Sequence, residues 1–275
     1  MPPISRKDLH HNFLKKIIVR LDFQGVLEPE MENILLKIKP YAKEKGFSRY
    51  EEKITNQIDI AVSQVGIEPP QASANQIRSQ KVYSFVDEDR GYVLDVSSSF
   101  VCLNITSTRY TPFEEYSEYL SAIAKIYQET IDFFTVKRFG LRKINECLIE
   151  DKQKISEYFS PVYFSAYNEL PGINTIQSNR ANIFIIDQYH VNLISNIVQG
   201  VAQGKTLYSI LLDLDVYLDT TKDIEELLAR NETFQEMNDL LFKIYLHALT
   251  EKFKEALSND GDFAIDDLIG IERND

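Results

Sequence analysis

Apolar and polar residues alternate along several short stretches of the first 150 residues. In KKIIVRLDF, an apolar row that starts at Ile17 points one way, whereas Arg20 and Asp22 point the other. Four similar runs follow between residues 53 and 106, rich in β-branched and aromatic residues: KITNQIDIAVSQV, KVYSFV, GYVLDVSS and FVCLNITS. We expect these runs to form an antiparallel meander, with the proline-containing segment GIEPPQASANQ as an exposed loop.

A first helix is predicted from about Glu30, where four apolar residues recur at helical spacing: Met31, Ile34, Leu35 and Ile38. Because Pro40 lacks a backbone donor, we expect it to end or kink this helix. Gly46 suits the helix stop that follows.

A second helix has the clearest start signal in the chain. Thr111, Pro112 and Glu114 supply an N-cap, a first-turn proline and a capping-box acid in that order. The helix should run to about Thr130, and it carries an apolar stripe that is expected to lie on the sheet: Tyr116, Leu120, Ile123, Tyr127 and Ile131. The strand FFTVKRFGLRKINECLI follows directly.

The remaining chain loosely repeats this order of elements. The extended runs NIFII, YHVNLISNIV and YSILLDLDVYL lead into helix from about Thr221, and the capping-box pair Thr233 and Glu236 predicts a long helix from Phe234 to Leu257. Its buried stripe should contain five residues: Phe234, Met237, Leu241, Ile244 and Ala248.

Runs of strands that precede each helix are typical of an α+β fold. We therefore predict antiparallel β-sheets built from two loosely similar halves and covered by long helices. The first half spans residues 1–150, the second spans residues 151–258, and an acidic tail spans residues 259–275.

The formal net charge of −12 disfavours a general nucleic-acid binder, because such affinity comes mainly from Lys and Arg. No apolar run approaches the ~20 residues of a membrane span, so we expect a cytoplasmic protein with no membrane partner. Cys102 and Cys147 lie in apolar runs and are expected to be reduced core thiols.

The two ends of the chain carry opposite charge, basic before residue 20 and acidic after residue 258. Unpaired, solvated ends and a disordered tail are the expected outcome. The alternative is that the ends meet, or that the apolar residues of the tail dock on its own domain or on a partner: Phe263, Ile265, Leu268, Ile269 and Ile271.

The string R-F-G-L-R-K-I-N runs from Arg138 to Asn145. It resembles the signature of a sporadically distributed prokaryotic family of uncharacterised proteins, whose members carry an R-x-G-L-R-Y-I-N strand after a long helix. Lys143 stands where that family usually has Tyr. Supporting similarities are KKIIVRLDF, ILLDLDV and HALTEKFKEAL. The resemblance implies no catalytic residue, and the scattered distribution of the family is compatible with a defence or toxin-linked locus, phage defence included.

Arg138, Gly140 and Arg142 share one face of their predicted strand, with the arginine Cα atoms roughly 13 Å apart. The glycine leaves a flat gap between two guanidinium groups, where a phosphate or carboxylate could bind. The alternative, which we favour, is that the arginines are held by carboxylates of a neighbouring strand, because Arg suits partly buried ion pairs.

Asp213 and Asp215 share one face of the strand LLDLDVYLD, with Cα atoms about 6.6 Å apart. Two carboxylates at this spacing can hold Mg²⁺ or Mn²⁺, or act as an acid and a base. D-x-D is a common pattern on strands, however. We favour a solvated face, or pairing of these carboxylates with Arg138 and Arg142.

Few other patterns indicate catalysis. His10 and His11 could be an acid and base pair but are expected to be unstructured, and His190 and His247 fit no metal-ligand spacing. The sequence lacks a P-loop, a G-x-G-x-x-G turn and a G-x-S-x-G elbow, so we predict no cofactor.

The expected function is a non-enzymatic binding or regulatory protein that recognises a protein partner or an anionic ligand. The alternative is a metal-dependent hydrolase or nucleic-acid-processing enzyme that uses Asp213 and Asp215. The sequence leaves the oligomeric state open.

Overall fold

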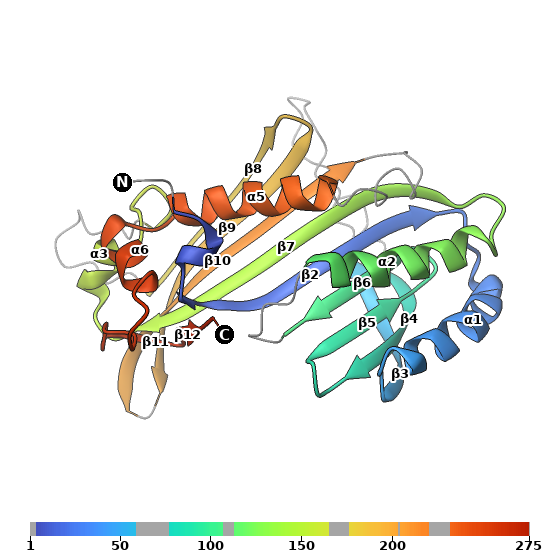
Figure 1. Ribbon diagram of the computed structural model, residues 1–275, viewed down its shortest axis with the longest axis horizontal. Coiled ribbons are helices and arrows are strands. Elements are labelled where there is room, and N and C mark those ends of the chain that lie inside the picture. The colour runs from blue at the N-terminus through green and yellow to red at the C-terminus, as the bar shows by residue number, and fades with distance from the viewer. Residues whose placement is uncertain are drawn as a thin grey trace.

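The computed structural model describes residues 4–58, 77–106, 113–164, 176–202, 204–219 and 232–274. One large antiparallel sheet dominates it, in the order β3-β4-β5-β6-β2-β7-β10-β9-β8, with the short β11 paired to β7 (Figure 1). The strands of the main path are β2 Leu14–Gln24, β3 Arg49–Ile58, β4 Ile77–Asp87, β5 Tyr92–Val96, β6 Phe100–Ile105, β7 Thr135–Ile149, β8 Gln177–Ile186, β9 Tyr189–Ala202 and β10 Lys205–Asp219. The predicted meander is confirmed, and strands from both parts of the chain meet where β7 pairs with β10.

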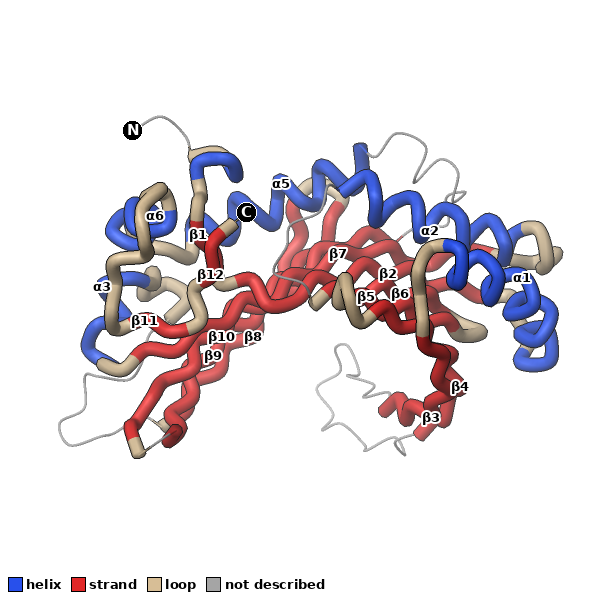
Figure 2. Tube along the Cα trace, turned by 60° about the horizontal axis from the view of Figure 1, so that its bottom comes forward, coloured by secondary structure: helices blue, strands red, loops and turns tan. Residues whose placement is uncertain are grey.

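The longer helices lie on one face of this sheet (Figures 1 and 2). Figure 2 shows the strands as an arch, with the helices over its convex side. The described helices are α1 Met31–Glu44, α2 Phe113–Gln128, α3 Ile155–Tyr158, α5 Glu232–His247 and α6 Glu251–Leu257, with single 3-10 turns η1 Arg6–Asp8, η2 Glu28–Glu30 and η3 Lys152–Lys154. Each predicted apolar stripe is buried in the core, and the described helices include none that is long and apolar enough to cross a membrane.

The α+β class is therefore confirmed. The loose similarity of the two halves and the division of the chain at residue 150 remain predictions. The GIEPPQASANQ loop, most of the start signal before α2 and the helix expected from Thr221 lie outside the described residues.

Helix α1 does not end at Pro40 but continues to Glu44. Proline removes the hydrogen bond to the carbonyl four residues earlier, which belongs to Leu36. Leu36 and Pro40 both lie on the exposed side of the helix, so water can take the place of the missing donor. The predicted stop at Gly46 is confirmed, because its φ of +93° reverses the chain and its N–H donates to the carbonyl of Lys43.

The predicted long helix from Phe234 to Leu257 is wrong, because it is broken between α5 and α6. Residues in the break pair with the end of α3 and the residues that follow it: the carbonyl of Ala248 accepts from Ser160, and the N–H of Thr250 donates to the carbonyl of Tyr158. The side chain of Thr250 then caps α6 by accepting from Phe253. Hydrogen bonds between residues 158–160 and 248–250 thus replace one turn of helix.

The expectation of solvated chain ends and a disordered tail is also wrong. Strand β1 (His11–Asn12) pairs with β12 (Glu272–Arg273), and β11 (Leu268–Ile269) extends the sheet beside β7. His11 is buried and its ring lies 5.5 Å from that of Phe263. The ends meet because the apolar residues of the tail pack on the core while Lys15 forms an ion pair with Glu272.

Candidate binding site on the open sheet face

From Phe139 onwards, strand β7 turns its odd-numbered residues towards the helices and its even-numbered residues towards the open face. Phe139 and Leu141 are fully buried on the helix side, as predicted. On the open face, the antiparallel register sets Arg142 opposite Asp215 of β10 and Arg138 opposite Asp22 of β2. Central strands from both parts of the chain therefore bring charged side chains together at the middle of the sheet.

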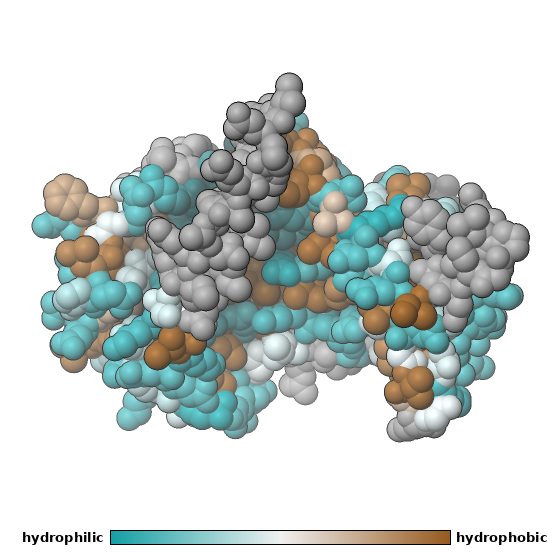
Figure 3. Space-filling view, turned by 180° about the vertical axis from the view of Figure 1, so that it is seen from behind, coloured by the Kyte–Doolittle hydropathy of each residue, from teal (hydrophilic) through white to brown (hydrophobic). Residues whose placement is uncertain are grey.

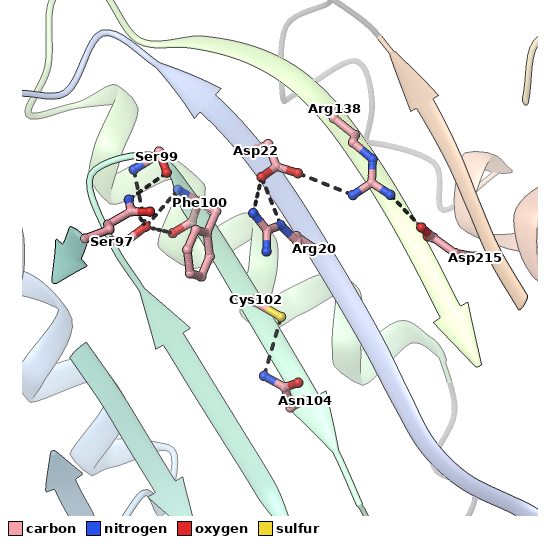
Figure 4. A network of polar contacts seen from close by, with 10 residues as sticks. Arg20, Asp22, Ser97, Ser99, Phe100, Cys102, Asn104, Arg138 and Asp215 are labelled. Carbon is pink, nitrogen blue, oxygen red and sulfur yellow. Dashed lines mark hydrogen bonds and ion pairs between the residues drawn. The ribbon is translucent and has the colours of Figure 1, made fainter. Parts of the chain in front are cut away.

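The two arginines of β7 form ion pairs with the aspartates of β10, which confirms the favoured prediction. Arg142 donates to Asp213 through two parallel bonds, Nε to Oδ1 at 2.7 Å and Nη2 to Oδ2 at 2.5 Å. Arg138 lies between two strands, 2.8 Å from Asp215 and 3.4 Å from Asp22 (Figure 4). The arginines thus cross-link β2, β7 and β10 through their side chains.

Gly140 packs closely against Tyr217 of β10, with the side chain of Arg138 beside it. A Cβ atom at this glycine would lie 3.2 Å from the Cβ of Tyr217 and 3.5 Å from the Cζ of Arg138. The guanidinium group of Arg138 lies over the Tyr217 ring, 4.2 Å from its centroid. The gap expected between the two arginines is therefore partly filled by Arg138 itself.

A neighbouring ion pair on β2 extends the cluster. Arg20 donates to Asp22 and stacks on the ring of Phe100 from β6, 4.2 Å from its centroid (Figure 4). Sequence reasoning did not include these residues in the site. The sequence does indicate that Arg20 and Asp22 face away from the core, because apolar and polar residues alternate in KKIIVRLDF. It does not show that β2 pairs with β7, because that is a long-range contact.

A pocket of about 530 Å³ opens on this face between β5, β6, β2, β7 and β10. Its charged lining consists of Arg20, Asp22, Asp95, Arg138, Arg142 and Asp215. Its apolar lining includes Ile18, Phe100 and Cys102. Figure 3 views the molecule from this side, where hydrophilic and hydrophobic residues alternate in the hollow between the two ends.

Burial raises the pKa of three groups that line the pocket. Desolvation raises the pKa of Asp215, although Arg138 and Arg142 oppose this. Desolvation also raises the pKa of Asp95, which accepts hydrogen bonds from Ser84 and Asn104. The pKa of Cys102 rises to about 12 for the same reason, so its thiol stays protonated near neutral pH.

The arginines are the outer members of their ion pairs. The side chain of Arg142 is 41% exposed, whereas that of its partner Asp213 is 6% exposed. Arg138 and Arg20 are likewise somewhat more exposed than Asp215 and Asp22. The pocket therefore presents guanidinium N–H donors to solvent above carboxylates that lie deeper.

Neither aspartate of the D-x-D pattern is free of protein partners. Asp213 accepts both bonds from Arg142, and Asp215 accepts from Arg138 and from Asn192. Within the described ranges, no group of three or more His, Cys, Asp or Glu residues is placed to hold a metal ion.

The histidines lie apart from one another. His190 stacks on Tyr217 with ring centroids 5.0 Å apart, and His247 bonds to the hydroxyl of Tyr163 at the far end of α5. His10 and His11 belong to the paired chain ends.

Neither a comparison with protein-family models nor a search of curated proteins finds a match for this chain. Membership of the R-x-G-L-R-Y-I-N family is therefore still a prediction, made from the residues of β7.

Proposed function

We propose that this chain is a non-enzymatic binding or regulatory protein, and that its open sheet face recognises an anionic group. That group belongs to a small ligand or to a protein partner, since both can offer carboxylate or phosphate oxygens. The observation that supports the proposal is the position of the arginines above their carboxylates in a pocket. An anion entering the pocket meets N–H donors first.

The arginines are also held in place before any ligand arrives. Arg142 uses two of its five N–H groups on Asp213, which leaves three for another acceptor. Arg138 is fixed between Asp22 and Asp215 and packs on Tyr217. Ordering these side chains in advance lowers the entropy cost of binding, and this is the usual gain from preorganisation.

The enzymatic alternative depends on the same aspartates. A metal ion at Asp213 and Asp215 would compete with guanidinium groups that already neutralise both carboxylates. This arrangement favours the binding protein, and the resemblance on β7 adds a defence or toxin-linked locus to the proposal.

The proposal is tested with inorganic phosphate and citrate as probes. We expect either anion at millimolar concentration to raise the melting temperature of the wild type, because it binds the folded state alone. The increment should vanish in Arg142→Met and persist in part in Arg142→Lys, which keeps the charge but loses the planar fork. Arg273→Met is the matched control, since Arg273 is an exposed arginine paired with Asp260 away from the pocket.

A protein partner is identified by the same variants. Proteins that co-purify with the wild type and the Arg273→Met control but are lost with Arg142→Met bind through the open face. If neither anion raises the melting temperature and no bound protein depends on Arg142, the open face is not a binding site and the proposal is wrong.

A further inference from the structure

A second pocket, of about 410 Å³, lies on the opposite, helix-covered side of the sheet. Its walls come from the segment before β2, from α5, from β7 and β10, and from the C-terminal end of the chain. Much of its lining is apolar or aromatic: Leu9, Leu14, Leu214, Leu241, Phe242 and Tyr245. Its volume and its apolar walls fit a small organic molecule.

Apart from a tyrosine hydroxyl, the ionisable side chains of the lining are all basic among the described residues. They belong to Arg6, Lys7, His10 and Lys143, and no carboxylate is among them. Arg6 reaches Asp239, 2.7 Å away, which does not line the pocket. Lys143 donates to the amide oxygen of Asn238 at 2.7 Å. The pocket therefore combines an apolar wall with an excess of positive charge.

Two residues of this lining each have a buried polar atom with no hydrogen-bond partner within the part of the chain that the structure describes. These atoms are the Nε of Arg6 and the hydroxyl of Tyr245. Tyr245 is only 8% exposed. A buried group without a partner costs free energy, so such groups are uncommon in folded proteins. They come from α5 and from the N-terminal segment, and both residues line the same pocket.

The amides beside them are satisfied by the protein. Asn145 donates to the carbonyl of Leu212 at 3.1 Å, and Asn274 donates to the carbonyl of Leu9 at 2.7 Å. Unsatisfied bonding capacity is thus not general to this lining. The groups that lack a partner, Arg6 Nε and the Tyr245 hydroxyl, can both donate to an oxygen.

We propose that this pocket binds a small amphipathic anion, a molecule with an apolar body and a carboxylate head. The head accepts hydrogen bonds from Arg6, Lys143 and Tyr245, and the body packs on the leucine side chains and Phe242. This site is separate from the one proposed on the open face, because β7 turns Lys143 and Arg142 to opposite sides of the sheet.

The state of Lys143 supports a carboxylate. Burial, together with the nearby charge of Arg6, lowers the pKa of Lys143 to about 7. A bound carboxylate would stabilise the ammonium form, which a neutral alcohol would do far less well. We therefore expect the head group of the ligand to determine its affinity. The test compares ligands that share one apolar chain and differ in their head group.

Decanoate, decanol and decylamine, each below its aggregation limit, are titrated into the full chain by calorimetry at pH 7. We expect decanoate to bind at one site and decanol and decylamine to bind at least tenfold more weakly, as the loss of a charged hydrogen bond would give. Tyr245→Phe should weaken decanoate binding about fivefold, and Lys143→Met at least tenfold.

Two variants are matched controls for these substitutions. Tyr163→Phe removes a hydroxyl that is bonded to His247 outside the pocket, and Lys154→Met removes an ammonium group paired with Asp267. Both should bind decanoate as the wild type does. Thermal melts of every variant establish that it is folded before titration.

Three results overturn the proposal. The first is no decanoate binding by the wild type. The second is equal affinity for decanoate and decanol, which would mark a cavity that takes any apolar chain. The third is unchanged decanoate affinity in both Tyr245→Phe and Lys143→Met.

Discussion

Arg142 and Lys143 are neighbours on β7, yet they lie on opposite faces of the sheet and are stabilised differently. Arg142 makes two charge-assisted bonds with the buried carboxylate of Asp213, and this contact raises its pKa. Lys143 donates to the amide of Asn238, and burial lowers its pKa to about 7. The charge of Arg142 is thus neutralised by an aspartate, whereas the charged form of Lys143 lowers the stability of the folded protein.

The difference follows from what covers each face. The open face stays in contact with water, so Arg142 can be partly exposed while its carboxylate partner is buried beneath it. The helices shield the other face from most water, and an ammonium group there loses part of its hydration. A site that costs stability in the free protein can regain it when a ligand binds, so the helix-covered pocket is the more sensitive of the two to occupancy.

The largest effect is expected from the residue before this pair. Leu141→Ala should lower the free energy of unfolding by about 2–5 kcal/mol, because Leu141 is fully buried in the main core and alanine would leave a cavity. Urea unfolding measures the change. A loss below about 0.5 kcal/mol would mean that the helix-facing side of β7 is wrongly assigned.

A smaller loss is expected on the open face. Arg142→Met leaves the buried carboxylate of Asp213 without its partner and should cost about 1–3 kcal/mol, less than a fully buried pair because Arg142 is partly exposed. The double variant Arg142→Met/Asp213→Leu should recover most of this loss, since no charge is then stranded. A double-mutant cycle in urea with no coupling would show that solvent screens the pair completely.

Lys143→Met should have the opposite sign and raise stability by about 1–2 kcal/mol at pH 7, because it removes a partly buried ammonium group that has lost much of its hydration. The folded pKa of about 7 lies below the value of 10.5 for a free lysine, so the unfolded chain binds the proton more tightly between these pH values. The cost of Lys143 is full below pH 7 and is lost as pH rises towards 10.5.

The advantage of Lys143→Met over the wild type should accordingly shrink as the pH is raised from 7 to 10. Urea unfolding at several pH values measures this difference. A constant difference across that window would mean that the folded protein does not desolvate the ammonium group of Lys143.

Local sequence patterns were enough to predict much of the fold. The alternation in β2, β7 and β10 predicted which residues face the core, and the stripe on α2 was correct at each of its positions. The errors lie where long-range contacts overrule a local signal. The helix expected to run to Leu257 breaks because Ala248 and Thr250 bond to residues at and just after the end of α3, about 90 residues earlier. The tail is ordered because β7 offers it an edge to pair with.

The candidate site was only half visible in the sequence. Charge balance was enough to predict that Arg138 and Arg142 meet Asp213 and Asp215. Arg20, Asp22 and Asp95 were missed because their place depends on the order of strands in the sheet, which alternation does not encode. The helix-covered pocket was missed for a similar reason, since it joins residues from both ends of the chain.

The smallest effect is expected from divalent metal, and it separates the binding protein from the enzymatic alternative. A Mg²⁺ or Mn²⁺ site at Asp213 and Asp215 would raise the melting temperature when metal is added, since the ion would bind the folded state. We expect no shift, because Arg142 holds both oxygens of Asp213 and Arg138 together with Asn192 engages Asp215. Scanning calorimetry of the wild type and Asp215→Asn, each with chelator and with millimolar Mg²⁺ or Mn²⁺, measures this. A rise that occurs in the wild type and disappears in Asp215→Asn would show that a cation displaces the guanidinium groups, and the open face would then be a metal site rather than a place where arginines receive an anion.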